Sequence, residues 1–365
     1  SINQFDWNEL IPTTIVYAIT LILGISGNLL IIITISKYRR MKSITNTFLA
    51  SLASADLLLV LVCTPVKLAK LFSYTWDIGW TMCKLIHYAQ NVSAICSVFT
   101  LTAMSVERYY AIVHPMRAKY VCTIRQARKI IISTWISSFL LAIPILFLQV
   151  HREVGDKKKG YWCVTNVEWP LAWKMHEVYM LIIVLVIPVC VMTVTYSAIC
   201  REICKVAQRR YHMTSAKGNL TFESYPLSSK KTTKIKTKTT KVRLDEENVT
   251  LKQQSTSYKS EKQVIKMLVA VVIIFVICWG PLLILNVLTA FGVVSALTPG
   301  PVKYFKTVFH LMAYFNSCVN PVVYGFMSKN FRESFSKALC CRKSNVRRQL
   351  SVSHTRTTSL RTYIN

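Results

Sequence analysis

Seven long apolar blocks dominate this 365-residue chain and constrain its fold more than any other feature. A helix of roughly 20 apolar residues crosses the hydrocarbon core of a bilayer, because only a helix pairs all of its own backbone groups there. The third block is long and also carries polar residues. We therefore predict membrane spans at Thr13–Ser36, Thr45–Leu71, Thr81–Val113, Ala127–Val150, Val178–Cys200, Val264–Phe291 and Phe305–Phe326.

Composition excludes several classes of protein. With 52% hydrophobic and 17% charged residues, the chain is too apolar for a soluble domain of this size. The net charge of +29 does not indicate a nucleic-acid partner, because the basic residues lie in short clusters between apolar blocks and in polar tails. The twelve cysteines form no pattern with zinc spacing, and the spans carry no nucleophile–base pair. We expect neither an enzyme nor a zinc protein.

The distribution of Lys and Arg predicts the orientation in the membrane. Short loops rich in Lys and Arg stay on the cytoplasmic side. The segment before the first span carries Asp6 and Glu9 but no Lys or Arg, which places the N-terminus outside and the C-terminus in the cytoplasm of a multi-pass plasma-membrane protein. The basic residues after the first span and between the third and fourth spans are Lys37, Arg39, Arg40, Lys42, Arg117, Lys119, Arg125, Arg128 and Lys129.

The predicted organisation has four parts. Because the chain starts at Ser1 without a methionine, we expect its N-terminus to be truncated or to lack a leader. The third inner loop is rich in Lys, Thr and Ser and too polar to bury a core, so we expect its middle to be disordered. The parts are an extracellular terminus (1–12), a bundle (13–328, with the third inner loop at about 201–262), an amphipathic helix (329–341) and a cytoplasmic tail (342–365).

The spans carry a series of short polar motifs. Polar groups at membrane depth are energetically costly, so such motifs indicate a function. They are Gly27-Asn28, Leu52–Asp56, Glu107-Arg108-Tyr109, Phe275 with Cys278–Pro281, Asn316-Ser317 and Asn320–Tyr324. Over about residues 13 to 341 this series resembles the rhodopsin-like (class A) G-protein-coupled receptors. The resemblance implies an all-α membrane protein, a seven-transmembrane helix bundle with a short amphipathic eighth helix.

The resemblance also assigns an activation switch. Arg108 matches the arginine that pairs with Glu107 at rest and meets the G protein when active, and Glu261 matches its second partner. Pro281 removes an intrahelical hydrogen bond and kinks the sixth span, so that its inner half can swing outward. The implied switch residues are Glu107, Arg108, Tyr109, Tyr196, Glu261, Phe275, Trp279, Pro281, Asn320, Pro321 and Tyr324.

Three further sites follow from the resemblance. Asp56, Ser97, Asn316 and Asn320 match the polar pocket that holds an allosteric sodium ion in many relatives, and no cofactor is required. Cys83 and Cys163 match the disulfide between the third span and the second outer loop, where oxidising conditions permit a bond. Cys340 and Cys341 follow the amphipathic eighth helix and match palmitoylation sites, with packing or plain exposure as the alternative.

The outer ends of the spans carry the evidence on the ligand. Gln90 stands where amine receptors carry an aspartate, and Tyr314 stands where opsins carry the retinal-binding lysine, so both classes are disfavoured. Glutamine recurs at this place among receptors for neuropeptide Y-like, orexin-like and cholecystokinin-like peptides, and its amide suits a peptide backbone. The resemblance thus indicates the neuropeptide-receptor subgroup. The predicted ligand contacts are Lys67, Gln90, Glu177, Asn286, Lys306 and His310, with His87 at the rim.

Two lysines of the second span leave alternatives open. Lys67 and Lys70 share one helix face, where they could pair an acidic side chain or a C-terminal carboxylate, or simply reach the membrane surface. For Lys70 we favour the second alternative, in which its side chain reaches the membrane surface. An alternative within the fold is a receptor for a lipid or small organic anion bound by Lys67 in an apolar cleft. A transporter or channel would need an internal repeat or charges along a pore, and the sequence has neither.

The expected partners are an extracellular peptide and a heterotrimeric G protein. Serines and threonines in the basic tail predict phosphorylation by receptor kinases followed by arrestin binding, since each phosphate adds about −1.5 to −2 charge. Attachment of the same basic tail to anionic membrane lipid is an equally compatible alternative. These tail residues are Ser351, Ser353, Thr355, Thr357, Thr358 and Ser359.

Overall fold

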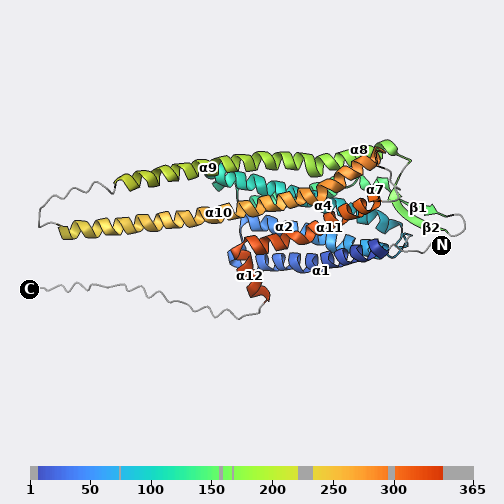
Figure 1. Ribbon diagram of the computed structural model, residues 1–365, viewed down its shortest axis with the longest axis horizontal. Helices are drawn as coiled ribbons and strands as arrows, with labels where there is room; N and C mark the ends of the chain where they lie inside the picture. The colour runs from blue at the N-terminus through green and yellow to red at the C-terminus, as the bar shows by residue number, and fades with distance from the viewer. Residues whose placement is uncertain are drawn as a thin grey trace, which may run out of the picture.

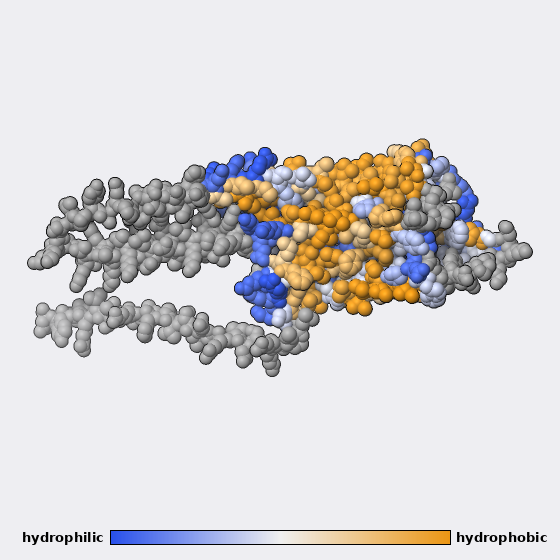
Figure 2. Space-filling model, viewed as in Figure 1, coloured by the Kyte–Doolittle hydropathy of each residue, from blue (hydrophilic) through white to orange (hydrophobic). Residues whose placement is uncertain are grey.

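The computed structural model forms one bundle of membrane-length helices. It describes residues 7–73, 75–155, 159–166, 168–220, 233–294 and 301–339, with only the backbone described at 210–220, 233–261, 301–302, 330 and 339. Six of the described helical segments are long and apolar enough to cross a membrane. Figure 2 shows the result as an apolar belt around the bundle, with hydrophilic residues gathered at its two ends.

The order of elements follows the seven predicted spans (Figure 1). The second and fifth spans each contain a short π-helical segment, η2 (Leu59–Cys63) and η3 (Ile182–Val186). Each of these segments separates two α-helices of the same span. The seventh span, α11, packs against α1 and α10. The spans are α1 (Trp7–Lys37), α2 (Ile44–Leu58) with α3 (Thr64–Lys70), α4 (Trp80–Val113), α6 (Ile124–Leu141), α8 (Pro170–Leu181) with α9 (Ile187–Leu220), α10 (Thr233–Ala290) and α11 (Pro301–Met327).

Short elements connect the spans. On the cytoplasmic side of the predicted topology, η1 (Arg39–Met41) follows α1 and α5 (Pro115–Val121) follows α4. On the opposite side, α7 (Ile145–Leu148) leads into β1 (Gln149–Val154), which pairs antiparallel with β2 (Gly160–Thr165). After α11, the short helix α12 (Lys329–Leu339) occupies the place predicted for the eighth helix and lies at the end of the bundle away from the hairpin (Figure 1).

Several boundaries differ from those predicted. α1 begins at Trp7, inside the segment predicted as a free terminus, because Glu9 accepts a hydrogen bond from Thr307 Oγ1 at 2.7 Å and pairs with Lys303 of α11. These contacts between helices stabilise an extra turn that hydropathy does not reveal. α6 stops at Leu141, before the predicted end at Val150; a turn that contains Pro144 and the short helix α7 follow, and β1 begins at Gln149.

The third inner loop also differs from expectation. α9 continues to Leu220 and α10 starts at Thr233, so both helices enter the segment from about 201 to 262 (Figure 1). The expected disorder in the middle of this loop concerns residues 221–232, which lie outside the described part of the chain. At the other boundary of the fifth span, α8 begins at Pro170 rather than Val178, since proline is favoured in the first turn of a helix.

α4 lies at the centre of the bundle and contacts α2, α6 and α9 as well as the strand β1. Its inward face is buried almost continuously from Val92 to Val98. Polar side chains bind across these contacts: Ser93 donates to the carbonyl of Ala55 at 2.8 Å, and Trp135 Nε1 donates to Ser51 Oγ at 3.1 Å. A polar group without a partner is expensive in hydrocarbon, so such bonds fix how the helices pack.

α1 and α11 approach each other closely at a proline. A Cβ atom at Gly27 would lie 2.8 Å from Pro321 Cβ, so only glycine allows this contact. Pro321 has no backbone N–H and cannot bond the carbonyl four residues earlier, at Ser317. The buried Asn28 amide donates to that carbonyl at 2.8 Å and to the carbonyl of Gly24 at 2.9 Å. One asparagine thus satisfies the backbone group that the proline leaves open.

The second outer loop is tied to the bundle by a disulfide between Cys83 and Cys163. Cys163 lies in β2 opposite His151 of β1, so the bond holds the middle of the hairpin against the start of α4. The backbone N–H of Trp76 donates to the carbonyl of Tyr161 at 2.6 Å, which attaches the preceding outer loop to the same hairpin. The hairpin is therefore held from two sides over the mouth of the bundle.

At the other end, α12 packs through Phe331, which is buried beside Tyr324 of α11. Arg40 of η1 donates to Glu333 of α12 at 2.7 Å. This hydrogen bond and the charge of Arg40 hold the pKa of the Glu333 carboxyl below its usual value. Both side chains are exposed, and such surface pairs contribute little to stability. Burial of Phe331 therefore anchors α12 more than the ion pair does.

We expect Asn28→Ala to lower the stability of the purified protein, because it leaves the Ser317 carbonyl unpaired inside the bundle. The cost of an unpaired buried group is about 1–3 kcal/mol. Ser26→Ala is the matched control on the same helix, since the exposed Ser26 hydroxyl bonds only within α1, to Ile22. Thermal unfolding in detergent measures both variants. Equal unfolding temperatures for the two variants would contradict this account of the proline contact.

Candidate functional site

A cavity of about 280 Å³ opens beneath the hairpin and is lined by α3, α4, α8, α10 and α11. All six side chains predicted to contact the ligand lie around it, as does His87. They come from five helical segments far apart in sequence and are brought together by the bundle. The six are Lys67, Gln90, Glu177, Asn286, Lys306 and His310.

One wall of this cavity is basic. Lys67 comes from α3, His87 from α4, and Lys306 and His310 from α11. His310 interacts electrostatically with both Lys67 and Lys306, which places the three groups near one another. The Nδ1 atom of His87 lies 3.0 Å from the carbonyl of Cys83 in its own helix, so its other ring nitrogen is left for the cavity.

Lys70 does not belong to this wall. Its ammonium lies 5.6 Å from the centre of the Trp76 ring, and its side chain is exposed. A cation over the face of a tryptophan is attracted by the ring. Lys67, one turn deeper on the same helix, lines the cavity and is only partly exposed. The structure thus separates the two lysines, which the sequence alone places on one face.

Gln90 is oriented by a bond across the bundle. The hydroxyl of Tyr314 in α11 donates to Gln90 Oε1 at 2.9 Å. Tyr314 is itself buried against Tyr17 of α1, with ring centres 5.5 Å apart in an edge-to-face arrangement. Since the amide oxygen of Gln90 is engaged, its amide NH2 is the group left to donate to a ligand.

Several lining residues were not predicted. Gln149 and Thr165 face each other across the hairpin, with Nε2 and Oγ1 3.3 Å apart, and both line the cavity. A strand inside a loop gives no membrane-span signal, so the sequence did not identify them. The other unpredicted polar or aromatic lining residues are Asn91, Trp173, His176 and Thr289, which show only as polar or aromatic groups near the outer ends of spans.

Two stacked aromatic residues of α10, Trp279 and Phe275, lie beneath the cavity. Trp279 lines the cavity floor and is stacked on Phe275, with ring centres 6.2 Å apart, and both are buried. Pro281 lies inside α10, two residues after Trp279 along the helix. A group that enters the cavity therefore meets a residue near the proline of α10.

Deeper still, a polar cluster surrounds the buried Asp56. Asn320 Nδ2 donates to Asp56 Oδ2 at 2.8 Å, and the Ser317 hydroxyl bonds the same carboxyl. Ser97 and Asn316 are also buried, and the Asn316 side-chain oxygen has no hydrogen-bond partner among the described residues. The described residues contain no group of three His, Cys, Asp or Glu side chains that could hold a metal ion. Carboxylate, hydroxyl and amide oxygens are ligands that hard cations prefer.

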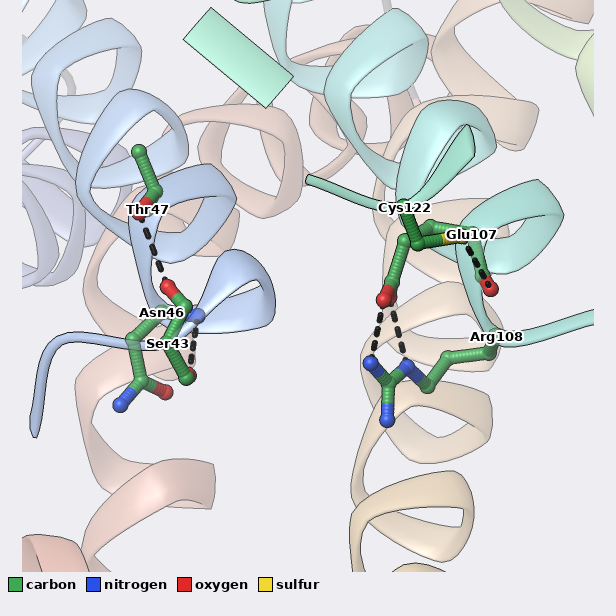
Figure 3. Close-up of polar contacts among 6 residues, drawn as sticks. All are labelled: Ser43, Asn46, Thr47, Glu107, Arg108 and Cys122. Carbon is green, nitrogen blue, oxygen red and sulfur yellow. Dashed lines mark hydrogen bonds and ion pairs between the residues drawn. The ribbon is translucent and has the colours of Figure 1, made fainter. Parts of the chain in front are cut away.

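At the end of α4 away from the hairpin, Glu107 and Arg108 form an ion pair within the helix (Figure 3). Arg108 Nε donates to Glu107 Oε2 at 2.6 Å, and a second guanidinium nitrogen binds the other carboxylate oxygen. The Cys122 thiol lies 3.9 Å from the backbone carbonyl of Glu107, and burial and the charge of Glu107 raise the pKa of that thiol. Tyr109 bonds His114 at 3.1 Å and takes no part in the pair.

Arg108 also faces a second cavity, of about 360 Å³, at this end of the bundle. Val264 and Met267 of α10 line it together with Phe331 of α12. Just beyond, the amide of Gln263 in α10 donates to the backbone carbonyl of Met327 at the end of α11. The inner end of α10 is thus held against α11, and this cavity is bordered by the helix whose inner half is predicted to move.

Two predicted switch tyrosines lie near this end. The hydroxyl groups of Tyr196 in α9 and Tyr324 in α11 are buried and have no hydrogen-bond partner in the described part of the chain. Tyr196 is close enough to Arg108 to interact with its charge. Three predicted residues cannot be placed: Glu261 lies in α10 with its side chain outside the described residues, and Cys340 and Cys341 lie outside them altogether.

Comparison with known proteins agrees with this arrangement. The model of the family described as 7 transmembrane receptor (rhodopsin family) matches residues 27–324. A cholecystokinin receptor of Xenopus laevis is 30% identical, over 88% of this chain and 75% of its own length. A gastrin/cholecystokinin type B receptor of Mus musculus is 31% identical, over 91% and 80%. A QRFP-like peptide receptor of Branchiostoma floridae is 28% identical, over 95% and 82%.

Proposed function

The chain belongs to the rhodopsin family of seven-transmembrane receptors, and we propose that it is activated by a peptide and signals through heterotrimeric G proteins. The observation that carries this proposal is the outer cavity, where hydrogen-bonding and charged side chains from five helical segments meet above Trp279. A peptide offers backbone amides and charged groups to such a wall. The protein is a receptor of the plasma membrane, not an enzyme.

The relatives support a peptide rather than another ligand. Those named here are receptors for cholecystokinin, gastrin or QRFP-like peptides, as their names state. Gln90 lines the cavity and accepts a hydrogen bond from the buried Tyr314, and both groups are neutral. An amine ligand would need a carboxylate there. The hairpin over the cavity mouth adds Gln149 and Thr165, which can contact the part of a peptide that remains outside.

The proposed mechanism transmits a shift at Trp279 to the cytoplasmic end. A ligand that contacts Trp279 disturbs its stacking on Phe275, and Pro281 allows the inner half of α10 to swing outward. That movement breaks the bond between Gln263 and Met327 and opens the cavity beside Arg108. A ligand shifts this equilibrium only to the extent that it binds the open state more tightly. Arg108 would then leave Glu107 and contact the G protein.

We also propose the orientation and the remaining partners. The N-terminus is extracellular, because the disulfide between Cys83 and Cys163 lies at the hairpin end and the basic loops lie at the other. Receptor kinases and arrestin act on the tail, or the tail binds membrane lipid. The tail and the proposed palmitoylation sites Cys340 and Cys341 lie outside the described residues.

We propose that the polar cluster around Asp56 binds a sodium ion that stabilises the resting receptor. Buried Asp56 and the unpaired oxygen of Asn316 support this, since a buried carboxylate needs a compensating charge or donors. The unfolding temperature of the purified receptor should rise when sodium replaces an equal concentration of choline. Asp56→Asn should abolish the rise. An equal response of the wild type to both cations would contradict the proposal.

The peptide proposal predicts a saturable G-protein response when cells that express the receptor are exposed to a library of synthetic neuropeptides. Gln90→Leu should reduce the potency of the active peptide roughly tenfold, because one hydrogen bond is worth about 0.5–1.5 kcal/mol. Lys70→Gln, at the same end of the bundle but outside the cavity, should leave potency unchanged. Silence of the library with the receptor at the cell surface would contradict a peptide ligand and favour a lipid or small organic anion.

The ion pair between Glu107 and Arg108 predicts the effect of Glu107→Gln. Weakening a pair worth about 1 kcal/mol should raise signalling in the absence of ligand by up to roughly fivefold. The measurement is basal G-protein activation at matched surface expression. Glu202→Gln is the control, since Glu202 of α9 pairs only with Lys205 one turn away, at 3.7 Å. Basal activity that is unchanged, or reduced, in Glu107→Gln would show that the pair does not restrain the receptor.

A further inference from the structure

The acidic and basic groups around the outer cavity come from different helices. The basic residues Lys67, Lys306, His87 and His310 come from α3, α4 and α11. Among the described residues that line the cavity, Glu177 of α8 is the sole carboxylate. α8 packs against α10 and α7, whereas α3 packs against α1 and η2. We call the lining from α3, α4 and α11 the basic side of the cavity and the lining from α8 its acidic side.

Lys67 on the basic side has no carboxylate partner in the described part of the chain. Its charged neighbours are Lys70 and the two histidines, which carry either positive charge or none. Asp56 lies three helical turns deeper, roughly 16 Å away along the same span, and Glu9 is occupied by Lys303 and Thr307. A partly buried cation at membrane depth without a counter-ion is costly. An anionic group that enters the cavity would remove this cost.

Glu177 on the acidic side is mostly buried, with 13% of its side chain exposed. Its nearest charged neighbour is His176, whose Nδ1 atom lies 3.5 Å from Glu177 Oε1 without forming a hydrogen bond. Asn286 and Thr289 of α10 line the same side and are neutral. Glu177 can therefore form an ion pair with a cationic group of a ligand.

Apolar side chains also line the cavity. Met180, Leu282 and Leu283 line it together with Trp279. At about 280 Å³ the cavity is at the small end of known ligand pockets, so only one end of a peptide enters it. An apolar side chain fits against these residues, and its neighbouring groups reach the basic side and the acidic side.

We propose that the part of the ligand inside this cavity is bipolar, with a carboxylate paired to Lys67 and a basic group paired to Glu177. This inference rests on the proposed peptide function and deepens it by giving the chemical class of the bound end. An amidated, uncharged peptide end would satisfy Gln90 but would leave Lys67 and Glu177 without counter-ions. Lys70 lies over Trp76 and takes no part.

The test uses the full-length receptor at the cell surface and the peptide that activates it most strongly in the library. That peptide is synthesised in matched forms, with each acidic side chain or free C-terminal acid changed to its amide, and with each basic group changed to a neutral one. The receptor variants are Lys67→Gln and Glu177→Gln. The matched controls are Lys70→Gln and Glu168→Gln, since Glu168 is an exposed acid on the outer loop that lies 3.9 Å from Arg152.

Removal of one specific carboxylate from the peptide should weaken potency on the wild type roughly 10- to 100-fold, as expected for a charged pair that loses one partner. The same change should have less than about threefold effect on Lys67→Gln, because the two changes remove one interaction. Basic groups should show the same pattern with Glu177→Gln. Both controls should respond as the wild type does.

Two results would overturn the inference, and they are distinguishable. If a peptide activates the receptor but its neutral forms are equally potent, or lose the same potency on Lys67→Gln as on the wild type, the bipolar ligand is wrong and the peptide function stands. If no peptide activates the surface-expressed receptor, the proposed function fails, and the inference that rests on it fails with it.

Discussion

Every polar group that lies within the hydrocarbon of a bilayer must find its partner inside the protein, and this constraint accounts for most of the architecture. Pro321 leaves the Ser317 carbonyl open, and Asn28 closes it from a neighbouring helix. Asp56 is buried, and Asn320 donates to it. These bonds join α1, α2 and α11 into a fixed unit on one side of the bundle. The bundle can therefore move only where such bonds are few.

α10 is the element with that freedom. Its membrane half packs largely through apolar side chains such as Phe275 and Leu282, and among the described residues of its inner end the Gln263 side chain bonds α11. The two cavities lie along this helix, one above Trp279 and the other beside Arg108. A signal between them thus needs no chain of specific contacts. It needs one helix with two packing states. The ligand in one cavity and the G protein at the other each shift the equilibrium between these states.

The sequence predicts the spans and the polar motifs well, because hydropathy and the spacing of polar residues are local. It also predicted all six residues that gather at the outer cavity, although their contact with a ligand stays a prediction. What it missed depends on contacts distant in sequence. The extra turn of α1 needs Lys303, the orientation of Gln90 needs Tyr314, and the lining by Gln149 needs the hairpin. The separation of Lys70 from Lys67 likewise depends on Trp76, which no helical spacing reveals.

The central claim is that the inner half of α10 moves away from the rest of the bundle when a ligand binds. The most direct measurement is the distance between spin labels at Lys262, on the inner end of α10, and Arg125, at the start of α6; both side chains are exposed. The account predicts a longer distance when the activating peptide and G protein are bound than without them, with the Phe275–Trp279 stacking intact only in the unbound receptor. An unchanged distance in a receptor that activates G protein normally would contradict it.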